Sequence, residues 1–165
     1  MTVQPVTFKD RYPELQYLVK EVMLVRAHNV RCVAENDRGH LLYFAEGALV
    51  LLALERFVRV VLGPRATDRD TLPNLLEKAV KDGLLVLPWE DQQDGIRKIN
   101  DVRRTLLHGN YEQAARFAGC ASVEEFFRSS QYISEVELLF NVLDHLMRQV
   151  DTTTGPNRSA GGGGS

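Results

Sequence analysis

The sequence predicts an all-α fold, on three observations. Apolar residues recur every three or four positions through most of the chain, which is the spacing of an amphipathic helix. No stretch shows the sustained alternation of a half-buried strand, and glycine, proline and capping residues cut the pattern into helical lengths. With 165 residues, 44% of them hydrophobic, the chain suffices for one globular core. We therefore predict a four-to-five-helix up-down bundle with short additional helices, formed by one domain over residues 1–150.

The first two predicted helices span about residues 11–36 and 41–62. Pro13 and Glu14 suit the first turn of the first helix, and Asp10 is its expected cap. The second helix is apolar almost all round in its first half, so we expect other helices or a second subunit to cover that half on two sides. Gly63 and Pro64 then end it, because a proline cannot continue a helix.

The later predicted helices span about residues 72–82, 89–108, 111–117 and 122–150. Thr71 is the expected N-cap of the first of these. Ser122 and Glu125 have the spacing of a capping box, which opens the last helical region. The apolar run at residues 84–87 is too short and isolated to support a sheet, so we predict a packed connector there.

Composition narrows the class of protein. A formal net charge of −2 and a pI near 6.1 argue against a general nucleic-acid coating role, so any RNA site must be a local basic patch. Cys32 and Cys120 lie far apart without metal-ligand spacing, so we predict no metal site. A reducing compartment fits this cysteine usage, and one disulfide between the two stays an alternative. The N-terminal residues are polar, and the most apolar window, residues 41–62, contains four charged residues. We therefore expect a cytoplasmic protein without a secretion signal or a membrane span.

Residues 151–165 are rich in Thr, Gly, Pro and Ser, and they end in Gly-Gly-Gly-Gly-Ser. This composition is typical of a flexible linker, and the last five residues resemble an engineered one. We therefore expect a flexible tail that takes no part in the fold.

The segment around Arg103 is the most informative part of the chain. Ile96, Ile99, Leu106 and Leu107 fall on one arc of a helical wheel, and Arg103 falls inside that arc. A guanidinium keeps its charge, and burying it without partners costs several kcal/mol. Arg103 therefore needs a carboxylate, a phosphate or water, and such local violations tend to lie at functional sites.

Five residues further on, His108 stands at the expected helix end, and histidine is the side chain that titrates nearest neutrality. The run Arg103-Arg-Thr-Leu-Leu-His108 matches the R-x4-6-H motif of the HEPN superfamily. The setting matches too, because the motif lies on the third long helix of an α-bundle and follows an apolar second helix. The chain resembles HEPN proteins over roughly residues 10–150.

The resemblance implies a metal-independent endoribonuclease of the toxin or antiviral-defence type that acts as a homodimer on RNA, without a cofactor. His108 would act as general base or acid while the RNA 2′-hydroxyl attacks the adjacent phosphate, and Arg103 would bind that phosphate. Five helical positions separate the two side chains by about 140°, so one regular helix does not point both at one phosphate. This geometry favours a site shared between two subunits.

Neighbouring residues are candidates for supporting roles. Asn100 and Arg104 share a helix face with His108, so Arg104 is a second candidate phosphate ligand. The family often has a smaller polar residue at the position of Arg104. In some HEPN toxins a partner nucleotidyltransferase modifies a tyrosine two residues after the histidine, whereas here Asn110 occupies that place and Tyr111 follows it.

Glu55, or else Glu46, on the preceding long helix is expected to pair with Arg103 and to hold its side chain in place. Two alternatives to the nuclease remain. One is a catalytically inactive HEPN module that dimerises and binds RNA or a partner protein, such as a nucleotidyltransferase antitoxin or a defence component. The other is an all-α scaffold in which Arg103 forms a structural salt bridge with Glu55 and His108 is merely favoured by the helix dipole.

Overall fold

The computed structural model describes residues 12–107 and 109–153, and in this part the chain contains α-helices, 3-10 turns and no strand. The all-α class is therefore confirmed. The elements are α1 (Pro13–Ala34), η2 (Arg38–His40), α2 (Tyr43–Leu62), η3 (Gly63–Arg65), α3 (Leu72–Lys81), α4 (Gln92–Leu107), α5 (Tyr111–Phe117), α6 (Val123–Phe127) and α7 (Ser130–Thr153).

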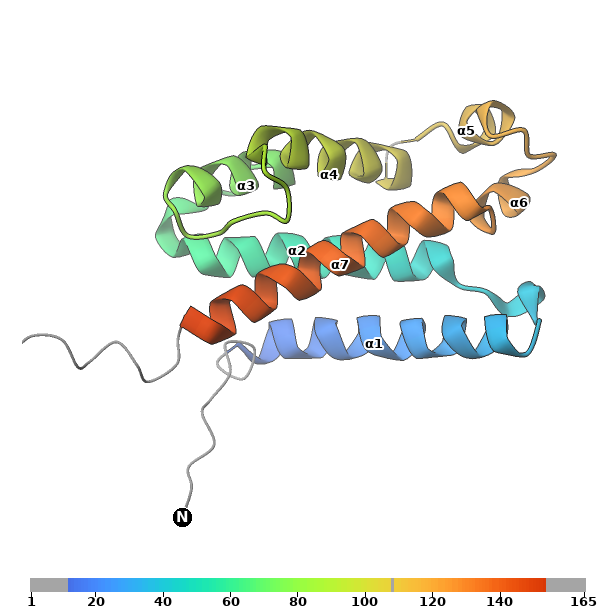
Figure 1. Cartoon of the computed structure of the whole chain (residues 1–165), viewed down its shortest axis with the longest axis horizontal. Coiled ribbons are helices and arrows are strands. Elements are labelled where there is room, and N and C mark those ends of the chain that lie inside the picture. The colour runs from blue at the N-terminus through green and yellow to red at the C-terminus, as the bar shows by residue number, and fades with distance from the viewer. Residues whose placement is uncertain (1–11, 108, 154–165) are drawn as a thin grey trace, which may run out of the picture.

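Four long helices, α1, α2, α4 and α7, run alternately in opposite directions along the long axis of the molecule (Figure 1). The central one is α2, because it contacts α1, α3, α4 and α7. The short helices close the two ends, with α3 beside α2 and α4 at one end and α5 beside α6 at the other. None of the described helices is both long and apolar enough to cross a membrane.

Close packing around α2 explains why its first half is so apolar. Gly47 lies where α2 meets α4 and α7, and a Cβ atom there would come within 3.2 Å of the side chains of both Leu106 and Val136. The interior of α2 is completed by buried residues such as Val50, Leu54 and Phe57. In the first half, the predicted covering is thus confirmed at Gly47 and Val50, whereas Leu52 on another face of the helix is 57% exposed.

The start of α4 differs from the prediction. It begins at Gln92 rather than near Trp89, because the Asp91 Oδ1 atom accepts hydrogen bonds from the backbone amides of Gln93 (3.0 Å) and Asp94 (3.1 Å). Asp91 thereby satisfies two of the amides that the first helical turn leaves without partners. Trp89 instead packs over Gly95, where an added Cβ atom would lie 2.6 Å from the Trp89 ring.

The other predicted caps have mixed outcomes. Asp10, the expected cap of α1, lies outside the described residues, and Thr71 precedes α3 without a side-chain capping bond. Ser122 does cap α6, because its Oγ atom accepts from the Glu125 amide at 3.1 Å. The Glu125 carboxylate, however, accepts from Ala121 (2.7 Å), one residue earlier than in a regular capping box. The predicted last helical region is therefore two helices, α6 and α7.

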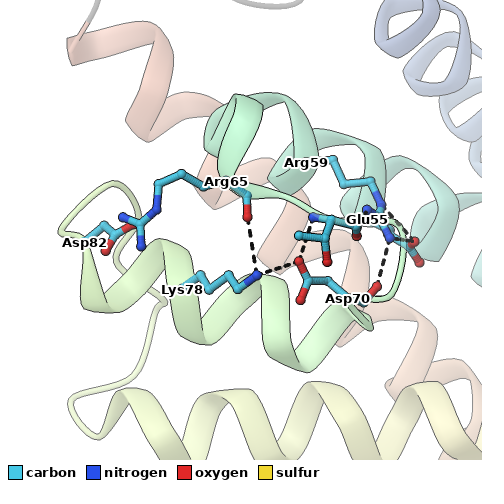
Figure 2. Close-up of polar contacts among 7 residues, drawn as sticks. Glu55, Arg59, Arg65, Asp70, Lys78 and Asp82 are labelled. Carbon is cyan, nitrogen blue, oxygen red and sulfur yellow. Dashed lines mark hydrogen bonds and ion pairs between the residues drawn. The ribbon is translucent and has the colours of Figure 1, made fainter.

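A polar cluster attaches the loop between η3 and α3 to the two helices beside it (Figure 2). Arg59 on α2 donates to the backbone carbonyls of Thr67 (2.9 Å) and Asp70 (2.8 Å). The Asp70 carboxylate in turn binds Lys78 on α3 at 2.6 Å. A further ion pair joins Arg65 to Asp82 at the end of α3. The loop is thus held by charged side chains from both α2 and α3.

Candidate functional site

The predicted apolar face of α4 is buried where its side chains are described, which excludes Leu107, and Arg103 lies at its edge. Ile96, Ile99 and Leu106 are all buried in the core, whereas Arg103 is only partly exposed. The Arg103 Nη1 atom donates a long hydrogen bond of 3.5 Å to Asn100 Oδ1, one turn earlier on the same helix. Within residues 12–107 and 109–153, Arg103 forms no ion pair. Its guanidinium is thus held by a neutral side chain.

The expected pairing of Arg103 with Glu55 is not formed. The Glu55 Oε1 atom accepts instead from Arg59, from Nε at 3.2 Å and from Nη2 at 3.1 Å, one turn along α2 (Figure 2). Glu55 and Arg103 do line one small pocket of about 140 Å³, together with Leu52, but without an ion pair between them. Arg59 competes successfully because it lies at the favourable i, i+4 spacing on the same helix.

Glu46 does not serve Arg103 either. Its side chain is 1% exposed and faces α1, where it accepts hydrogen bonds from Arg26 Nη1 (3.0 Å) and Asn29 Nδ2 (2.8 Å). Arg26 also binds Glu137 on α7 at 2.9 Å, and its guanidinium lies 3.8 Å from the centre of the Phe140 ring. Glu46 therefore belongs to a buried network that joins three helices.

The sequence contained one signal for this network that the sequence analysis misread. Glu46 is a lone carboxylate in the most apolar part of α2, so it needs a buried partner just as Arg103 does. Nothing in the spacing shows whether that partner comes from α1 or from α4, because both helices contact α2. Arg26 and Asn29 on α1 supply it.

A stripe of apolar residues that are exposed or half-buried runs along α2 beside Arg103. It consists of Phe44, Ala48 and Leu52, which follow one another at four-residue spacing, and we name it the α2 stripe. Leu52 is 57% exposed although α2 is the central helix of the bundle. Ala48 and Leu52 line the same pocket as Arg103. Arg103 thus borders an apolar surface that residues 12–107 and 109–153 cover only in part.

His108 lies outside the described residues, between Leu107 and Gly109. The structure therefore describes the position of Arg103 but not that of its predicted catalytic partner. Gly109 approaches the last turn of α4 so closely that an added Cβ atom would lie 2.5 Å from the Thr105 carbonyl oxygen. A glycine is needed immediately after His108 for this steric reason.

Arg104 lies in a separate hollow from Arg103. It is exposed and lines a groove of about 450 Å³ between the end of α4 and the start of α5, which we name the α4–α5 groove. The residues that line the groove are Asp101, Arg104, Thr105, Gly109, Asn110, Gln113, Ala114 and Phe117. Arg103 and Arg104 therefore lie on different surfaces of α4, although they are adjacent in sequence.

Asn110 and Tyr111 are both engaged in structural contacts. The Asn110 side chain caps α5 by accepting a hydrogen bond from the Gln113 amide at 3.2 Å. The Tyr111 hydroxyl donates to the Leu106 carbonyl, and its ring packs edge-on against Phe127, with 5.1 Å between the ring centres. Burial raises the pKa of Tyr111, which keeps the hydroxyl protonated.

One further polar residue was missed by the sequence analysis. Glu135 on α7 is partly buried, and its Oε2 atom is buried without a hydrogen-bond partner among the residues described. Burial raises the pKa of its carboxyl group. A glutamate in an amphipathic helix carries no sequence signal of this kind, because its exposure depends on how α7 is rotated against its neighbours.

Comparisons of the chain with protein-family models, with curated proteins and with solved structures find no match. The relationship to the HEPN superfamily therefore stays a prediction, which rests on the motif from Arg103 to His108 and on the order of the helices.

Proposed function

We propose that the protein is a metal-independent endoribonuclease of the HEPN kind, with an active site shared by two copies of the chain. The observation that carries the proposal is the state of Arg103. This arginine borders the core, yet it forms no ion pair with any residue described, and its neighbour Glu55 binds Arg59 instead. A guanidinium left without a carboxylate is available to bind a phosphate with its planar fork of donors.

The proposed chemistry is transesterification within the RNA backbone. The 2′-hydroxyl oxygen forms a bond to the adjacent phosphorus while the bond from phosphorus to the 5′-oxygen breaks. The 2′-hydroxyl loses a proton and the departing 5′-oxygen gains one; His108 carries out one of these transfers and a water molecule the other. Arg103 stabilises the charge that develops on the phosphate oxygens. The products are a 2′,3′-cyclic phosphate and a 5′-hydroxyl.

The α2 stripe supports the dimeric part of the proposal. Leu52 and Ala48 are apolar, incompletely covered and adjacent to Arg103 in one pocket. A two-fold contact through this surface would bury the stripe against its own copy and bring Arg103 of each subunit to the interface. The arrangement would allow Arg103 of one subunit to act with His108 of the other.

A second candidate is the inactive module that binds a partner protein, such as an antitoxin or a defence component. The outer face of α1 favours it, because Tyr17, Met23, Leu24 and Val30 are all exposed there. A surface of this kind on a soluble domain commonly marks a protein interface. It lies away from α4, which contacts α2, α3 and α7.

The test is incubation of the purified protein with labelled RNA in EDTA, with the product ends analysed for cyclic phosphate. We expect the wild type to cleave, and Arg103→Ala and His108→Ala each to slow cleavage by about 100-fold or more. Arg97→Ala is the matched control, because Arg97 is an exposed arginine of α4 that pairs with Asp94. A folded wild-type protein that cleaves none of several RNAs would contradict the nuclease and favour the partner-binding module.

A further inference from the structure

The α4–α5 groove contains an aromatic side chain that the fold does not use. Phe117 ends α5 and is 83% exposed, more than any other large hydrophobic residue in the described part of the chain. Exposing a phenyl ring to water gives up the stabilisation that its burial would provide. The ring lines the groove together with polar side chains from α4. A flat aromatic surface beside hydrogen-bonding groups is suited to a flat, polar ligand.

Two charged groups line the same groove without neutralising each other. Asp101 and Arg104 are exposed residues three positions apart on α4, and they form no ion pair with each other. In the residues described, Arg104 has no other carboxylate partner. The groove therefore presents a carboxylate that accepts hydrogen bonds and a guanidinium that donates them.

This combination fits an unpaired nucleobase better than a bare phosphate. Proteins recognise single-stranded RNA by stacking its bases on aromatic side chains and by hydrogen-bonding the base edges. A volume of about 450 Å³ lies within the usual range of small-ligand sites. The carboxylate of Asp101 would repel a phosphate, but it complements a base that carries N–H donors.

Guanine matches both charged groups. Its N1–H and amino group suit a carboxylate acceptor, and its O6 and N7 atoms are the preferred targets of an arginine. Thr105 and Asn110 add little to recognition, because the Thr105 hydroxyl already donates to the Asp101 carbonyl and the Asn110 side chain already caps α5. Asp101 and Arg104 are therefore the charged groups that select the base, and the exposed amide of Gln113 lies in the same groove.

We propose that the α4–α5 groove holds one unpaired guanine of a single-stranded RNA, stacked on Phe117 and read by Asp101 and Arg104. The inference deepens the proposed function and rests on it for the identity of the polymer. Arg103 lies on a different face of α4, so a strand that crosses the helix would place a phosphate near Arg103 and a neighbouring base in the groove.

The test measures binding separately from cleavage. Fluorescent hexamers of 2′-O-methyl RNA lack the attacking hydroxyl, so their affinity for the protein is read by anisotropy without cleavage. One hexamer contains a guanine among uridines and the other contains uridine alone. We expect tighter binding of the guanine hexamer, about tenfold weaker binding with Phe117→Ala, and near-normal binding with Phe117→Trp, which restores a stacking surface. Asp101→Asn should remove the preference for guanine.

Leu84→Ala is the matched control, because Leu84 is an exposed apolar residue of the connector between α3 and α4. Equal affinity of the wild type and Phe117→Ala for both hexamers would overturn the inference, as would a change in oligomeric state with Phe117→Ala and no change in affinity. If Phe117→Ala weakens binding while the wild type cleaves no RNA, the result supports guanine binding in the groove and contradicts the proposed nuclease activity. If the wild type cleaves RNA and Phe117→Ala binds both hexamers as the wild type does, the result supports the nuclease activity and contradicts guanine binding in the groove.

Discussion

At the scale of single residues, the end of α4 and the start of α5 divide their polar side chains into two kinds. Asn110 and Tyr111 form hydrogen bonds that stabilise the fold. The Asn110 side chain caps α5, and the Tyr111 hydroxyl donates to the Leu106 carbonyl. Arg103 and Arg104 form no ion pair with the described residues and keep most of their donors. The two arginines therefore keep donors for a ligand, which is a phosphate for Arg103 and a base edge for Arg104 in the proposals above.

Glu135 offers a test of side-chain burial. Its carboxyl pKa is raised by burial, so folding disfavours the charged form, and Glu135 reduces stability as the pH rises above its unfolded value of 4.5. We predict that Glu135→Gln raises the melting temperature by a few degrees at pH 8 and leaves it nearly unchanged at pH 4. Calorimetry at the two pH values measures this, with exposed Glu77→Gln as control. A stabilisation equal at both pH values would show that charge is not the cause.

The prediction of individual residues from sequence succeeded where one element decides the outcome. The burial of Ile96, Ile99 and Leu106 follows from their spacing on one helix. The expected pairing of Arg103 with Glu55 or Glu46 was wrong. Glu55 binds Arg59 one turn along the same helix, whereas Glu46 binds Arg26 on α1, a choice that depends on how the helices pack. Arg59 forms an ion pair with Glu55, and Arg26 forms one with Glu46.

At the scale of elements, the order of the helices follows from periodicity and from breakers, whereas their ends depend on capping contacts. The second helix ends at Leu62, as Gly63 and Pro64 predict. The start of α4 was predicted three residues too early, because the tryptophan at 89 extends the apolar pattern while Asp91 provides the actual cap. The division between α6 and α7 was missed since both halves carry the same helical periodicity.

The loop before α3 provides a prediction at this scale. Hydrogen bonds from the Lys78 ammonium and the Thr67 amide lower the pKa of Asp70 to about 2 from an ordinary value of 3.8. Asp70 therefore stabilises the fold above pH 4, and that contribution is lost as the pH falls through about 2. We predict that Asp70→Asn lowers the melting temperature by a few degrees at pH 7, and that the difference shrinks between pH 4 and pH 2.

Asp68→Asn is the control for this variant, because Asp68 is an exposed aspartate of the same loop. Thermal unfolding followed by circular dichroism at several pH values gives the result. A destabilisation that stays constant down to pH 2 would show that the amide disturbs the loop sterically rather than through the lost charge. Equal melting temperatures of Asp70→Asn and the wild type at pH 7 would show that the Lys78 contact adds nothing to stability.

At the scale of the whole molecule, two exposed apolar surfaces are candidates for contacts with other chains. One surface is the α2 stripe, which borders Arg103. The other is the exposed apolar face of α1, which is a different helix packed against α2. A dimer through the α2 stripe places Arg103 at the interface, whereas a contact through α1 leaves it at a distance. The sequence predicted the bundle but not these surfaces, because outward apolar residues have the same periodicity as inward ones.

The most direct test of the shared site mixes two inactive variants, Arg103→Ala and His108→Ala, through unfolding and refolding together, and measures RNA cleavage. If Arg103 of one subunit acts with His108 of the other, each mixed dimer regains one intact site, so the mixture recovers about a quarter of wild-type activity. Each variant refolded alone should remain inactive. Wild-type cleavage that is not recovered by the mixture would contradict the shared site and place the catalytic pair within a single subunit.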